Sequence, residues 1–121
     1  MDGFRFLEWP VYADAKDMVR SIFSVTNKFP QGLRIELGSQ INRAAISVLL
    51  NVAEGSGKNS DKDFSRFLNI AIGSIYETVA GLDIAKDAEL IGEKEFSELV
   101  KKLLSIAKQL GGFKKELKRS L

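Results

Sequence analysis

The sequence predicts an all-α protein, an antiparallel up-down four-helix bundle that forms a single domain over residues 1–121. Three observations carry this prediction. Apolar residues recur at helical spacing in four segments. Both prolines, Pro10 and Pro30, lie in the first quarter of the chain, so the later segments contain no obligatory helix breaker. No segment alternates like a half-buried strand, and the short links between segments favour antiparallel neighbours.

The first helix is expected over about residues 11–28 and the second over about residues 39–54. Between them, Phe29-Pro30 predicts a turn, because the residue before a proline is steered away from helical dihedrals and a glycine follows shortly after. Ser39 stands at the expected start of the second helix, where its hydroxyl would be an N-cap.

The third helix is expected over about residues 61–89, and Ser60 with Asp63 resembles a weaker capping box at its start. The fourth helix, about residues 93–118, has a nearly heptad apolar seam with Gly111-Gly112 as a soft point near its end. Before the first helix lies a short aromatic N-terminal arm that we expect to pack on the bundle or on a neighbouring subunit; it contains Phe4, Phe6, Trp9 and Tyr12.

The chain contains no cysteine and no histidine. Their absence excludes disulfides, thiolate nucleophiles, imidazole bases and the usual zinc, haem and di-iron sites. We therefore expect no catalytic residue, no metal and no cofactor. The longest apolar runs are too short to span a membrane, and the acidic start Met1-Asp2-Gly3 is not typical of a secretory signal, so a cytoplasmic protein is expected.

A polar stripe runs beside the apolar face of the second helix, and a second polar line runs along the third. If these helices pack antiparallel with paired residue numbers summing to 120, Glu54 meets Arg66 and Arg43 meets Glu77. Both charged pairs are then complementary. We interpret the stripe as a structural polar network that fixes the register of the two helices. The network comprises Gln40, Arg43, Ser47, Asn51, Glu54, Arg66, Asn69, Gly73 and Glu77.

Two glycines of the third helix, Gly73 and Gly81, lie two turns apart on one face and would allow a neighbouring backbone to approach closely. In the same register, the carboxylates of Glu54 and Glu77 lie several helical turns apart. They are too distant to act as a general acid and base pair.

The net charge is only +2, but residues 93–121 carry eight basic against four acidic side chains. Several of the basic side chains fall in a narrow arc opposite the apolar seam of the fourth helix, where they could contact phosphates or simply form a solvated face. The possible nucleic-acid contacts are Lys101, Lys108, Lys115 and Arg119.

Three motifs occur in order along the second and third helices: Q-x-x-R-A-x-x-S from Gln40, N-x-A-E-G from Asn51, and F-x-x-x-A-x-G-S-x-x-E from Phe67. With Phe29-Pro30 before them, they resemble the four helix bundle protein family, also called 23S rRNA-intervening-sequence protein. The resemblance implies an up-down bundle that assembles into a ring-like homopentamer. It also implies a bacterial source, in some cases from insertions in the large ribosomal RNA gene, and no known catalytic activity.

We therefore expect a non-enzymatic, homo-oligomeric helical scaffold, with RNA or a nucleic-acid-binding protein as a possible partner. A first alternative is a small-molecule binder or enzyme that uses the polar stripe around a cavity. A second is a protein-binding adaptor that exposes the apolar surface of its N-terminal arm.

Overall fold

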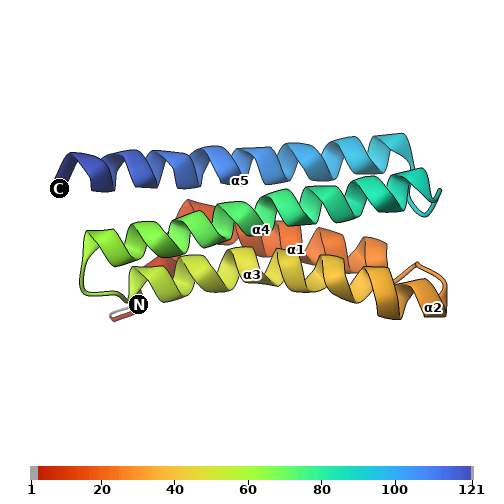
Figure 1. Ribbon diagram of the computed structural model, residues 1–121, viewed down its shortest axis with the longest axis horizontal. Helices are drawn as coiled ribbons and strands as arrows, with labels where there is room; N and C mark the ends of the chain where they lie inside the picture. Colours follow the sequence, from red (N-terminus) through yellow and green to blue (C-terminus); the bar gives the residue numbers. More distant parts are fainter. Residues whose placement is uncertain (1–2, 121) are drawn as a thin grey trace.

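The structure is a computed structural model that describes residues 3–120, with side chains as far as Leu117. Four long helices lie side by side and alternate in direction, so the fold is the expected all-α, up-down four-helix bundle (Figure 1). The α3–α4 connection and the C-terminal end of α5 lie at one end of the bundle. The α1–α2 and α4–α5 connections lie at the other end (Figure 1).

Helix α1, Pro10–Thr26, starts with the proline at its first position, where a missing N–H and a fixed φ suit a helix. It is preceded by the 3₁₀ turn η1, Arg5–Glu8, and ends two residues earlier than expected. The arm before α1 is only partly packed. Trp9 stacks on Phe64 at 6.0 Å between ring centroids, while Phe4 remains 59% exposed.

The second long helix begins eight residues earlier than the sequence pattern predicts. Helix α2, Gln31–Leu33, starts directly after Pro30 and continues through a π-helical segment η2, Arg34–Gly38, into α3, Ser39–Ser56. The prediction of an N-cap at Ser39 is therefore wrong: its hydroxyl donates to the Ile35 carbonyl inside the continuous helix. Gly38 does not end the helix because it is buried in helical conformation, facing Phe29 and Thr26.

Helix α4, Asp61–Asp87, begins as expected, because the Asp63 N–H donates to the Ser60 hydroxyl at 3.1 Å. It is also the helix, within residues 3–120, that is long and apolar enough to cross a membrane by length and composition. A single helix of this kind is weak evidence of a membrane span, because the core helix of a soluble protein has the same length and composition. Several apolar side chains of α4 are also exposed on the surface of the bundle.

Helix α5, Glu93–Ser120, follows a tight turn after α4. Glu89 adopts φ 61°, a left-handed conformation that favours glycine, and the Leu90 N–H donates to the Ala85 carbonyl at 2.9 Å. This bond pattern closes α4 with a Schellman-type cap, so the predicted helix end at residue 89 lies two residues too late.

One hydrophobic core runs the length of the bundle and draws on all four long helices. Its fully buried members include Met18 and Ile22 of α1, Ile41 of α3, Leu82 of α4 and Leu103 of α5. Among the described side chains, no buried polar atom lacks a hydrogen-bond partner. The hydrogen-bonding groups of the described interior side chains are thus all paired. Candidate functional features are therefore sought on the surface.

Candidate functional site

A short ladder of hydroxyl and amide groups joins α3 to α4. The hydroxyls of Ser47 and Ser74 lie 2.8 Å apart, and the Asn51 amide donates to the Ser47 hydroxyl at 3.0 Å. One turn further along α4, the buried Thr78 hydroxyl donates to the Ser74 carbonyl at 2.7 Å. These contacts give the antiparallel packing a register in which facing residue numbers sum to 121, one more than expected.

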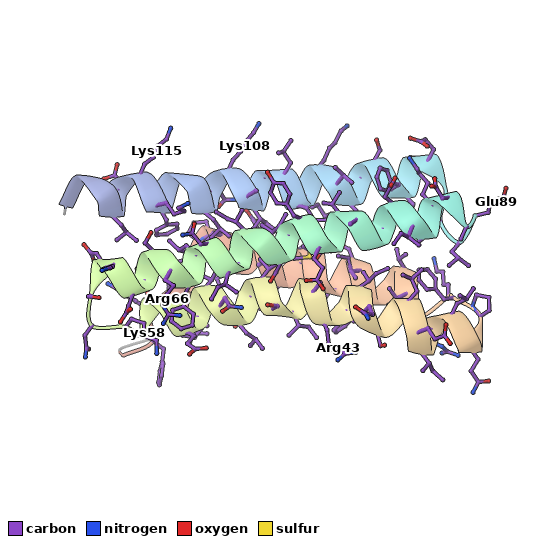
Figure 2. All side chains as sticks on the ribbon, viewed as in Figure 1. Arg43, Lys58, Arg66, Glu89, Lys108 and Lys115 are labelled. Atoms are coloured by element: carbon purple, nitrogen blue, oxygen red, sulfur yellow. The ribbon has the colours of Figure 1, made fainter. Side chains whose placement is uncertain are left out.

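The charged pairs expected between the two helices are absent, and that part of the polar network is wrong. Glu54 pairs with Lys58 at 3.7 Å, and Arg66 pairs with Asp63 at 3.8 Å, each within its own segment of chain. Arg43 lies on the outer edge of α3 and points away from α4, so it cannot meet Glu77 (Figure 2). Long charged side chains reach solvent at the helix edges, while only the short hydroxyls fit between the helices.

The remaining members of the predicted network do not join the ladder. Asn69 and Gly73 are exposed on the outer side of α4, and an added Cβ at Gly73 would meet nothing within 4 Å. Gln40 is exposed beside the start of α3. Of the two glycines expected to allow close approach, Gly81 does so, since an added Cβ would lie 2.7 Å from Ile41 Cγ1, and Gly73 does not.

Two cations approach the ring of Phe67 at the end of α3 and the start of α4. Lys58 Nζ lies 5.0 Å and the Arg66 guanidinium carbon 4.6 Å from the ring centroid. Both side chains lie near the α3–α4 connection in Figure 2. Arg66 is thus held by an aromatic face as well as by Asp63, which sequence periodicity did not indicate.

The outer face of α4 is unusually poor in charge. Between residues 67 and 82 the helix contains a single charged residue, Glu77. Three large apolar or aromatic side chains of α4 project into solvent: Tyr76 is 72%, Ile84 56% and Ile70 42% exposed. A solvated helix face is normally rich in charged side chains, so this weakly charged face is a candidate interaction surface.

Apolar grooves lie on both sides of this face. Between α3 and α4, a groove of about 460 Å³ is lined by Leu37, Ile41 and Ala80, with Gln40 and Glu77 at its margins. Between α4 and α5, a smaller groove of about 260 Å³ runs past Tyr76, Val79, Val100 and Leu104. Gln40 and Glu77 are the members of the predicted polar network that line the α3–α4 groove, while Glu54 lines a separate pocket beside the N-terminal arm.

The lysines singled out on the fourth helix form a row on the outside of α5. Lys101, Lys108 and Lys115 are exposed, and Lys108 and Lys115 point away from the bundle (Figure 2). In the described part of the chain none of the three has an ion-pair partner. Arg119, the fourth predicted contact, has a side chain outside the described residues.

Lys102, by contrast, lies on the flank of α5 that faces α1 and forms an ion pair with Asp17 at 2.5 Å. The hydrogen bond and positive charge of Lys102 lower the pKa of the Asp17 carboxyl below its ordinary value. Both side chains are substantially exposed, so the pair contributes to the α1–α5 contact only weakly.

Chemistry and fold together define a small helical-bundle protein with a hydroxyl ladder inside and exposed apolar side chains on the outer face of α4. Within the described residues, no three histidine, cysteine, aspartate or glutamate side chains lie close enough to hold a metal ion. The family model of the 23S rRNA-intervening sequence protein matches residues 8–112, and the chain belongs to that family.

A crystal structure of a protein with unknown function from the S23 ribosomal protein family of Bacteroides thetaiotaomicron has the same fold. It is 24% identical in sequence, with a TM-score of 0.78 over 87% of this chain and 98% of that one. No curated protein matches the chain.

Proposed function

We propose that the protein is a non-catalytic scaffold that assembles from identical subunits in the cytoplasm. The supporting observation is the outer face of α4: Tyr76 and Ile70 are exposed within residues 67–82, a stretch of sixteen residues with one charge, and Ile84 is exposed just beyond it. A second copy of the chain is the partner that is always present. Five copies in a ring are what the family resemblance implies, and a ring would bury this face in every subunit.

Apolar burial on this face contributes only part of the association free energy. Complete burial of a large apolar side chain contributes about 1.5–3 kcal/mol, and these side chains are already partly buried. Association itself costs at least about 4 kcal/mol in lost translational and rotational freedom. The assembly therefore also needs burial from the neighbouring grooves and complementary polar contacts.

The test is the molar mass in solution, measured by multi-angle light scattering from low to high protein concentration. We expect a mass several times 13.4 kDa for the wild-type chain. Substitutions Tyr76→Glu and Ile84→Glu should shift the mass toward one subunit. Phe23→Glu is the matched control, because Phe23 is 40% exposed on α1, away from the α4 face. A wild-type monomer at every concentration would refute the scaffold.

RNA binding is a second candidate function, favoured by the exposed lysine row of α5. Charge reversal at Lys108 and Lys115 should then weaken binding to ribosomal RNA fragments. Affinity should fall steeply as salt rises, because phosphate contacts release counterions. Lys62→Glu on α4 is the control, since Lys62 is exposed outside the row. Binding that responds neither to salt nor to these reversals would exclude the row as an RNA surface.

Two alternatives from the sequence have narrower support. A small-molecule site would use the α3–α4 groove, which Gln40 and Glu77 face while Arg43, Asn51 and Glu54 do not line it. An adaptor role would use the arm, where Phe4 is exposed. Neither region gathers as much unpartnered apolar surface as the α4 face.

A further inference from the structure

The groove between α3 and α4 is acidic at its edges and apolar at its floor. Glu36 and Glu77 stand at its margins, and Leu37, Ile41 and Ile84 line it. Neither lysine nor arginine is among its lining residues. An occupant of this groove should therefore present an apolar side chain flanked by positive charges.

One wall of the groove has an unusual backbone. Glu36 and Leu37 belong to the π-helical segment Arg34–Gly38, which places an extra residue in the turn and widens the helix there. On the opposite wall, Gly81 lets α4 approach Ile41, so the floor consists of side chains from both helices. The groove is thus a product of the fold, with a volume of about 460 Å³.

The outer side of α5 in the same chain has the complementary pattern. Lys101, Leu104 and Lys108 follow one another at i, i+3 and i+7 and so lie along one helix face. Leu104 is 52% exposed, and both lysines are exposed without an ion-pair partner among the described residues. One turn beyond Lys108, Gly111 and Gly112 have nothing within 4 Å of an added Cβ, so the fold of the subunit does not require glycine there.

The two groove carboxylates and the two lysines of α5 also have similar separations along their helices. In the register given by the Ser47–Ser74 contact, Glu36 is level with residue 85, eight residues beyond Glu77. Eight residues of helix separate the two carboxylates by about 12 Å along the bundle axis. Seven residues separate Lys101 from Lys108, which is about 10.5 Å along α5.

We propose that the α3–α4 groove of one subunit receives α5 of a second copy of this chain. Leu104 enters the apolar floor, and Lys101 and Lys108 lie against Glu36 and Glu77. The inference rests on the proposed scaffold function and specifies its interface. Because groove and lysine row are different surfaces of one chain, the contact is head-to-tail, and repeated contacts generate a closed ring when the rotation closes.

Charge reversal tests this interface. The double variant Glu36→Lys with Glu77→Lys should raise the subunit dissociation constant at least tenfold, and Lys101→Glu with Lys108→Glu should do the same. The quadruple variant, which exchanges the charges across the interface, should recover the wild-type mass. Sedimentation velocity provides the readout, and circular dichroism checks that each variant stays helical. Lys16→Glu with Arg20→Glu, both exposed on α1, is the control and should leave the mass unchanged.

The outcomes separate the two proposals. A wild-type chain that is monomeric refutes the scaffold and this interface together. A wild-type oligomer whose mass survives both double reversals refutes the interface alone. If Lys101→Glu with Lys108→Glu keeps the mass but loses RNA affinity, the row serves RNA and the interface is overturned. Loss of mass in both double variants with recovery in the quadruple variant establishes the contact.

Discussion

Glu89 is the non-glycine residue, among those described, whose backbone adopts a left-handed conformation. Its φ of 61° lies in the left-handed region, which disfavours a side chain with a Cβ, and its side chain points outward from the end of the bundle (Figure 2). We expect Glu89→Gly to stabilise the protein by about 0.5–1 kcal/mol, because glycine is the preferred residue at this point of a Schellman cap. Urea unfolding followed by circular dichroism measures the change.

The neighbouring residue provides the control for Glu89. Ala88 has an ordinary φ of −81°, so Ala88→Gly only adds backbone freedom to the unfolded chain and should destabilise by a similar amount. If both glycine substitutions change the unfolding free energy in the same direction, the left-handed strain at Glu89 is refuted as the cause.

Between elements, one close approach of α3 to α4 depends on the glycine at position 55. An added Cβ at Gly55 would lie 2.8 Å from Phe67 Cβ and 2.9 Å from a Phe64 ring carbon, so α3 and α4 would have to move apart. We expect Gly55→Ala to destabilise by about 1–3 kcal/mol through overpacking, despite the better helix propensity of alanine. Thermal unfolding at low protein concentration measures the effect.

Gly73→Ala is the matched substitution for Gly55→Ala, because Gly73 lies on the exposed side of α4 with space around its Cβ position. It should stabilise the isolated subunit by up to about 1 kcal/mol through helix propensity. Equal losses at Gly55 and Gly73 would show that the close α3–α4 approach is not what Gly55 provides.

The contact between α1 and α5 should depend on pH through Asp17. Lys102 keeps the pKa of this carboxyl below its ordinary value of 3.8, so the pair stabilises the fold above that pH and loses its contribution as pH falls through the folded value. Asp17→Asn should therefore destabilise at pH 7, by less than about 1 kcal/mol, and have a smaller effect near pH 2. Chemical unfolding of both proteins at the two pH values is the test; an equal effect at both would contradict the ion pair.

The helices themselves could be predicted because their apolar spacing is a property of each segment alone. The start of the second long helix could not, because Gly32 and Gly38 indicate a break in isolation. The structure carries the helix through Gly38, where packing against Phe29 and Thr26 holds the glycine in helical conformation. A tertiary contact thus outweighed a local preference that costs about 1 kcal/mol.

The polar stripe was predicted on the correct helices but with the wrong partners. Periodicity identifies a face without fixing how far two helices slide past each other, and the register was chosen to pair charges. In the structure the small hydroxyls of Ser47 and Ser74 occupy the interior, where a long charged side chain would lose hydration. Ser74 was present in the sequence motif, and weighting short polar residues above charged ones would have found it.

On the scale of the whole molecule, the helices differ in how many large apolar side chains they expose to solvent. Exposed large apolar side chains occur on the N-terminal arm, η1, α2, η2, α3, α4 and α5, with Phe4, Ile35, Leu50, Tyr76, Ile84 and Leu104 each more than half exposed. On α1 the one exposed large hydrophobic residue among those described is Phe23. Because α1 lies behind α3 and α4 in Figure 1, the apolar surface is concentrated away from it, as expected for a subunit with an inner and an outer side.

If subunits associate through this exposed apolar surface, the thermal stability of the protein depends on its concentration. If assembly covers the α4 face, the folded oligomer is favoured by mass action, and the midpoint of thermal unfolding should rise as subunit concentration increases. For a chain of 121 residues, a gain of 1.4 kcal/mol per tenfold concentration step corresponds to an upper limit of about 5 °C. Differential scanning calorimetry from about 10 to 500 μM covers the range.

Tyr76→Glu should abolish the concentration dependence and leave the midpoint of the most dilute sample nearly unchanged, because Tyr76 is 72% exposed and contributes little inside the subunit. Phe23→Glu should retain the wild-type slope. A midpoint that is independent of concentration in the wild-type chain would contradict assembly. A slope that persists in Tyr76→Glu would show that copies associate through a face other than the outer side of α4.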